Sequence, residues 1–146
     1  MKQLERQINF EIPLERVWSV WTDVENSLRW VSGVQESRIT SEVRQGPGLV
    51  WQETIQLSGM PVPMKHTMTE CRLHEKAVID TELPLGGWMR RTLQFSSVAK
   101  STKVLFKMEW DMGGAGLFLK PEEEEVLVQN SLEETLRNWK ALAEKA

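Results

Sequence analysis

Two charged residues, Glu53 and Arg91, occupy positions where the alternation of a strand turns side chains toward the interior. Glu53 shares the parity of its apolar neighbours in "LVWQETIQL", and Arg91 does so in "GWMRRTLQF". A buried charge is costly unless it is paired, so either Glu53 and Arg91 bind each other or Arg91 holds a ligand carboxylate or phosphate. The alternative is a strand end or a β-bulge that turns one of them outward.

Histidine and cysteine offer less chemistry. His66 and His74 are eight positions apart on one predicted strand, without the HExxH or clustered Cys/His spacing of a zinc site. We interpret both as surface histidines and predict neither a metal site nor a cofactor. Cys71 has only Arg72 as a basic neighbour, and Arg72 points to the opposite face, so Cys71 is interpreted as an inert small apolar residue.

A glycine-rich stretch and an acidic run precede the C-terminus. "GGAG" (113–116) lacks the lysine and the serine or threonine of a P-loop and the spacing of a dinucleotide-binding motif, which favours a flexible link. The glutamates at 122–125 suit the positive N-terminal end of a helix dipole and are interpreted as a solvated helix start. Neither segment is predicted to bind a ligand.

These candidates have to be positioned by strands. The alternation at 4–12 predicts a first strand that stops at Pro13. Further segments of strand length, separated by turn signals such as "QGPG" and "LPLGG", are expected at 34–43, 48–58, 64–74, 77–83, 88–98 and 103–111. In the last of them, "KVLFKMEWD", apolar residues alternate with charged ones, which predicts a sheet with one face in water.

Helical spacing appears twice. After Pro13, apolar residues recur every three or four positions, which predicts a short helix, followed by a second short helix from Asp23 to about Leu28. A long helix is predicted from near Pro121 to the end of the chain. Its apolar stripe, which must dock on the sheet, consists of Val128, Leu132, Leu136, Trp139 and Ala143.

Composition excludes several classes of protein. With 18 basic and 21 acidic residues the formal charge is −3, which provides no basic surface for a nucleic acid. No apolar run reaches the length of a membrane span, so an integral membrane protein is not expected. The N-terminus lacks the apolar core of a secretion signal, and the single cysteine allows no internal disulfide, so a cytoplasmic location is expected.

The order of strand, two short helices, six strands and a long helix predicts an α+β fold in one domain spanning 1–146. Three segments, "IPLERVWSVWTDVENSLRWVSGV", "MTECRLHEKAVI" and "LEETLRNWKALAE", resemble the START-like, or SRPBCC, superfamily and its polyketide cyclase/dehydrase-like group. The resemblance runs nearly the whole chain and implies the helix-grip fold, a curved seven-stranded antiparallel sheet around the C-terminal helix. The sequence departs from the usual pattern at His74–Lys76, where a proline is missing, and at Trp139, where leucine is more common.

The resemblance also implies a cavity between the concave sheet face and the long helix, which relatives use to hold small apolar molecules. Inward parity and the helix stripe predict its lining as Trp51, Glu53, Ile55, Met89, Arg91, Leu93, Phe106, Met108, Trp110, Leu132, Leu136 and Trp139. Leu57 and Phe95 share that parity. The alternative is a solid core, which periodicity does not distinguish from a lined pocket, since Trp110 and Trp139 could fill the space.

Three functions follow, in order of preference. The first is a carrier or sensor that binds a small hydrophobic molecule of lipid, polyketide or aromatic type. The second is a cyclase- or dehydratase-like enzyme using the same cavity, with Glu53 or His66 as acid or base and Arg91 as partner of an oxyanion or carboxylate. The third is a stress- or chaperone-linked protein-interaction module.

Overall fold

A computed structural model describes residues 2–57, 59–114 and 120–145 of the chain. It contains seven strands, two α-helices and two short 3₁₀ helices among these residues. In chain order they are β1 (Lys2–Phe10), α1 (Leu14–Thr22), η1 (Val24–Arg29), β2 (Val34–Ile39), β3 (Val50–Leu57), β4 (Met60–Arg72), β5 (Lys76–Glu82), η2 (Pro84–Gly86), β6 (Trp88–Val98), β7 (Ser101–Asp111) and α2 (Pro121–Glu144).

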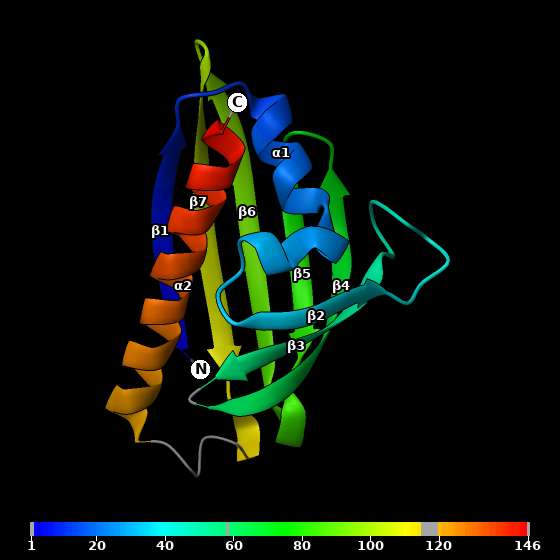
Figure 1. Ribbon diagram of the computed structural model, residues 1–146, viewed down its shortest axis with the longest axis vertical. Coiled ribbons are helices and arrows are strands. Elements are labelled where there is room, and N and C mark those ends of the chain that lie inside the picture. Colours follow the sequence, from blue (N-terminus) through cyan, green and yellow to red (C-terminus); the bar gives the residue numbers. More distant parts are fainter. Residues whose placement is uncertain (1, 58, 115–119, 146) are drawn as a thin grey trace.

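The strands form one antiparallel sheet in the order β1-β7-β6-β5-β4-β3-β2. The sheet curves around α2, and α1 and η1 lie on the same side of the sheet as α2 (Figure 1). The predicted fold class, a helix-grip arrangement of seven antiparallel strands with two short helices after the first strand, is confirmed. None of the described helices is long and apolar enough to span a lipid bilayer.

One boundary that differs from the prediction is the start of β4. The segment "SGMPVP" was predicted to be a turn, but β4 begins at Met60 and contains Pro61 and Pro63. Proline is tolerated there because this part of β4 pairs with β3 only, and pairing with β5 begins at Lys65. The chain therefore makes a long β3–β4 hairpin that bends away from the rest of the sheet (Figure 1).

The edge strands are also shifted. β1 covers Lys2–Phe10 and not 4–12, because the chain leaves the sheet after Phe10 to begin α1. β2 ends at Ile39, short of the predicted end at 43. Ser41 explains the early end, since its hydroxyl donates to Val43 O at 2.6 Å and accepts from Val50 N at 2.9 Å in place of regular strand pairing.

The apolar stripe of α2 faces the sheet as predicted. Leu132, Leu136, Trp139 and Ala143 are buried, and Val128 is half-buried. The helix is also tied to β1 by ion pairs of 2.5 Å, from Arg6 to Glu133 and from Lys2 to Glu124. Of the predicted link at 113–116, Ala115 and Gly116 lie outside the described residues.

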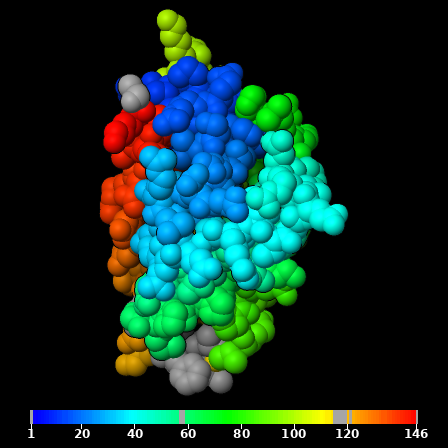
Figure 2. Space-filling view, turned by 45° about the vertical axis from the view of Figure 1, so that its right-hand side comes forward, coloured from blue at the N-terminus to red at the C-terminus, as the bar shows by residue number. Residues whose placement is uncertain are grey.

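The two tryptophans of α1 and Trp30, which directly follows η1, are core residues. Trp21 lies 5.0 Å and Trp30 lies 5.9 Å from the ring of Trp139, measured between ring centroids, and Phe10 lies 4.9 Å from it. Trp18 packs edge-on against Phe95 at 4.9 Å. In the space-filling view the blue-to-cyan segment from α1 to β2 covers the upper and central part of this side of the molecule (Figure 2). Aromatic rings from α1, from α2 and from the residue after η1 therefore fill much of the space between the sheet and α2.

Candidate functional site

A group of polar side chains lies in the interior, surrounded by the apolar core. We call it the polar cluster, and it consists of Ser27 (η1), Glu53 (β3), His66 (β4), Thr81 (β5) and Arg91 (β6). The first four are buried and Arg91 is partly buried. Four neighbouring strands and one helix thus each contribute one polar residue to the concave side of the sheet.

Both carboxylate oxygens of Glu53 are hydrogen-bonded. His66 Nε2 lies 2.8 Å from Glu53 Oε1, and the Ser27 hydroxyl donates to Glu53 Oε2 at 2.7 Å. Glu53 is only 6% exposed, so these bonds replace the water that an exposed carboxylate would bind. The Ser27 contact also fixes η1 against β3.

The second ring nitrogen of His66 defines its protonation. Arg91 Nη2 lies 3.1 Å from His66 Nδ1, and the Thr81 hydroxyl lies 2.6 Å from the same nitrogen. Arginine has only donors, so Nδ1 must accept and the ring proton sits on Nε2, where it is donated to Glu53. This geometry fits a neutral His66 between a guanidinium cation and a carboxylate anion.

The surroundings shift the pKa values of Glu53, His66 and Arg91. Burial raises the pKa of Glu53, but the hydrogen bond from His66, the charges of His66 and Arg91 and the Ser27 hydroxyl outweigh it, so the pKa is lowered overall. The pKa of His66 is lowered by burial and by the positive charge of Arg91, although Glu53 opposes both. Burial also lowers the pKa of Arg91, which nevertheless keeps its proton in proteins.

Acid is therefore expected to destabilise the fold through this cluster. The unfolded chain protonates His66 near its ordinary pKa of 6.5, whereas the folded chain does so only at lower pH. The contribution of His66 to the free energy of unfolding is fully present above pH 6.5. It is lost as the pH falls below 6.5, by up to about 1.4 kcal/mol per pH unit. Glu53 adds a loss in the same direction below its ordinary pKa of 4.5.

Urea denaturation at pH values on both sides of 6.5 measures this loss. His66→Gln should flatten the dependence, while His74→Asn should preserve it, since Asn tolerates the positive φ of 62° at that position. A dependence that survives in the His66 variant and disappears in the His74 variant would contradict the assignment.

The polar cluster corrects one sequence-based interpretation and bears on the alternatives left open for Glu53 and Arg91. His66 is not a surface histidine but 1% exposed, with its ring 5.0 Å from that of Trp51. Glu53 and Arg91 both turn inward, but no direct ion pair joins them in the described part of the chain, because His66 lies between them. The burial of His66 could have been predicted from its strand parity with Met64 and Met68, which are also buried.

A small cavity of about 20 Å³ adjoins the polar cluster. This volume holds roughly one water molecule. Arg91 Nε is buried beside this cavity and has no hydrogen-bond partner among the described residues, which leaves one donor available. The cavity is lined by Trp21, Val24, Ser27, Trp30, Val31, Trp51, Glu53, Met68, Ile79 and Arg91.

Only Trp51, Glu53 and Arg91 of the predicted lining border this cavity. Met89 is half-buried. The other predicted lining residues are buried in the hydrophobic core, namely Ile55, Leu93, Phe106, Met108, Trp110, Leu132, Leu136 and Trp139. Phe95 is buried as well, and the side chain of Leu57 lies outside the described part. The contribution of η1 and the residue after it could not be predicted from the sequence, because the spacing of residues there does not indicate the directions of the Ser27 and Trp30 side chains.

Cys71 and His74 lie outside the polar cluster. Cys71 is half-buried, and burial raises the pKa of its thiol, which opposes formation of the nucleophilic thiolate. His74 is half-buried with its ring 5.8 Å from that of Trp18. Within residues 2–57, 59–114 and 120–145, no three His, Cys, Asp or Glu side chains are grouped to hold a metal ion.

The curved sheet around α2 defines a START-like protein of the helix-grip class. A family model described as "Polyketide cyclase / dehydrase and lipid transport" matches residues 1–144, so the chain belongs to this family. None of the curated proteins matches the sequence of the chain.

Solved structures share the fold at low sequence identity. A START superfamily protein from Mycobacterium smegmatis superposes with a TM-score of 0.82 at 10% identity, over 98% of this chain and 97% of that one. The Zhui aromatase/cyclase from a Streptomyces species gives 0.81 at 17% identity, over 99% and 94%. A conserved protein from Geobacillus kaustophilus gives 0.77 at 10% identity, over 99% and 96%.

Proposed function

We propose that this protein binds a small hydrophobic molecule, of lipid, polyketide or aromatic type, between the concave sheet face and α2, as a carrier or sensor. Membership of a family described by polyketide cyclisation and lipid transport supports this proposal. The observation that carries it is the buried Nε–H of Arg91, which has no partner among the described residues and lies beside a cavity lined mainly by apolar side chains. A hydrogen bond from this donor to a ligand oxygen would stabilise the complex.

Binding of such a ligand requires the cavity beside Arg91 to enlarge. Small-molecule sites usually have volumes of about 300 to 1,000 Å³, far above the 20 Å³ found beside Arg91. Trp21 belongs to α1 and Trp30 directly follows η1, and both rings line this cavity. Neither helix is part of the sheet, although hydrogen bonds from Ser27 to Glu53 and from Ser37 to Val24 O hold η1 against β3 and β2. Outward movement of these two helices would enlarge the cavity, and the ligand would favour that open state by binding it preferentially.

Titration with dodecanoic acid and with dodecanol tests the proposal. Wild-type protein should bind both, and the acid more tightly, because its carboxylate can accept a charge-assisted hydrogen bond from Arg91. Arg91→Met should weaken binding of the acid by about tenfold or more and leave the alcohol nearly unchanged, at a temperature where circular dichroism shows both proteins folded. Equal losses for both ligands would place Arg91 outside the site.

A second candidate is a cyclase- or dehydratase-like enzyme, favoured by the contact between Glu53 and His66 at the edge of the same cavity. There the Glu53 carboxylate would act as general base and the Arg91 guanidinium would stabilise an oxyanion. Turnover of a polyketide or aromatic substrate that disappears in Glu53→Gln, with a pH–rate profile that follows Glu53, would favour this function over a carrier.

A further inference from the structure

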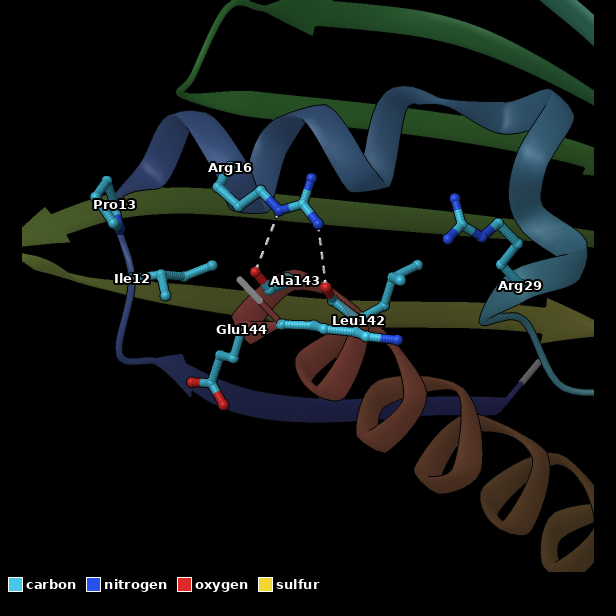
Figure 3. Close-up of a pocket in the computed structure, with 8 residues that line it drawn as sticks. Ile12, Pro13, Arg16, Arg29, Leu142, Ala143 and Glu144 are labelled. Atoms are coloured by element: carbon cyan, nitrogen blue, oxygen red, sulfur yellow. Dashed lines mark hydrogen bonds between the residues drawn. The ribbon is translucent and has the colours of Figure 1, made fainter.

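A larger hollow lies on the outside of the molecule, and none of the residues that line it belongs to the polar cluster. We call it the outer hollow, and it occupies about 590 Å³ between the start of α1, the end of η1 and the last turn of α2 (Figure 3). Ile12, Pro13 and Leu142 give it an apolar part. Its cationic part consists of Arg16 in α1, Arg29 in η1 and Lys145, which directly follows α2.

The three cations are not equivalent. Arg16 donates to the carbonyls of Ala143 and Leu142, both at 3.3 Å, and so compensates the negative end of the α2 dipole. Arg29 and Lys145 are exposed, and within the described ranges neither side chain forms an ion pair or a hydrogen bond. Two positive charges therefore remain uncompensated beside the outer hollow.

The acidic residue of this lining is turned away. In Figure 3 the Glu144 carboxylate points to the side opposite Arg16 and Arg29. It accepts a hydrogen bond from Glu11 N at 2.7 Å and pairs with Lys140 at 3.0 Å. The outer hollow is thus positive in a chain whose formal charge is −3. Its volume lies in the range of small-molecule sites.

We propose that the outer hollow is a second binding site, for a small organic anion with an apolar body. A carboxylate or phosphate would lie between Arg29 and Lys145, while the apolar body would cover Ile12, Pro13 and Leu142. This site shares no residue with the cavity beside Arg91.

Calorimetric titration with naphthalene-2-carboxylate tests this site, with naphthalene-2-carboxamide as the uncharged analogue. Arg29→Gln and Lys145→Gln should each raise the Kd of the carboxylate about threefold and together about tenfold, as expected for exposed charge pairs. Added salt should weaken binding of the carboxylate and leave the amide unaffected. Arg38→Gln removes an exposed charge on β2 and should change nothing.

Two results would overturn the second site. One is equal affinity of the Arg29→Gln/Lys145→Gln double variant and the Arg38→Gln control for the carboxylate. The other is backbone amide shifts, on addition of the carboxylate, that fall outside residues 12–16, 29 and 142–145.

Discussion

Replacing Trp139 by alanine is expected to lower the free energy of unfolding by about 3 to 5 kcal/mol, as large-to-small changes of buried aromatic residues do. The Trp139 side chain is fully buried and contacts the aromatic rings of Phe10, Trp21 and Trp30. Its indole N–H also donates to Val17 O at 3.4 Å. Alanine would leave a cavity bordered by rigid rings that cannot close it.

Chemical denaturation of Trp139→Ala and of Arg137→Ala measures the difference on one helix. Arg137 is exposed and two positions away, so its replacement should change the free energy of unfolding by no more than about 0.5 kcal/mol. Similar denaturation midpoints for the two variants would show that the aromatic contacts of α2 contribute little to stability.

Replacing Arg91 by methionine is expected to cost about 3 to 5 kcal/mol, because the buried Glu53 carboxylate would lose the positive charge that offsets its own. Arg90 is the matched control. It follows Trp88 and Met89 on β6 and pairs with Asp80 at 2.6 Å on the solvent side of the sheet, where both partners are well exposed. Arg90→Met should therefore cost at most about 1 kcal/mol.

Thermal and urea unfolding of the two variants decide this prediction. The paired experiment changes the same residue type at consecutive positions of one strand, so strand propensity and change in net charge cancel. If both arginines proved equally dispensable, the negative charge of Glu53 would have to be neutralised by another group or by protonation.

Most of the architecture was predictable, because alternation and helix spacing report which face of an element is buried. The stripe through Leu132 and Trp139 and the inward parity of Glu53 and Arg91 are examples. The start of β4 was not predictable, because prolines normally end strands and only the local absence of β5 makes Pro61 and Pro63 acceptable.

The site was less predictable than the fold. The spacing of His66 from His74 gives no information on burial, whereas the parity of His66 with the buried Met64 and Met68 indicates an inward side chain. The Ser27 contact depends on how η1 turns relative to β3, which is a tertiary property without a sequence period. The size of the cavity depends on where the indole rings of Trp21 and Trp30 lie, and periodicity gives no information on side-chain conformation.

Occupation of the space inside the grip can be observed directly from the tryptophan indole N–H resonances in a nitrogen-15 correlation spectrum as dodecanoic acid is added. Trp21, Trp30 and Trp51 line the interior cavity, whereas Trp88 is 39% exposed and lies outside it. A ligand held beside Arg91 should shift the three cavity resonances in a saturable manner and leave Trp88 unchanged. Saturable binding with no change at Trp21, Trp30 or Trp51 would contradict a ligand site between the sheet and α2.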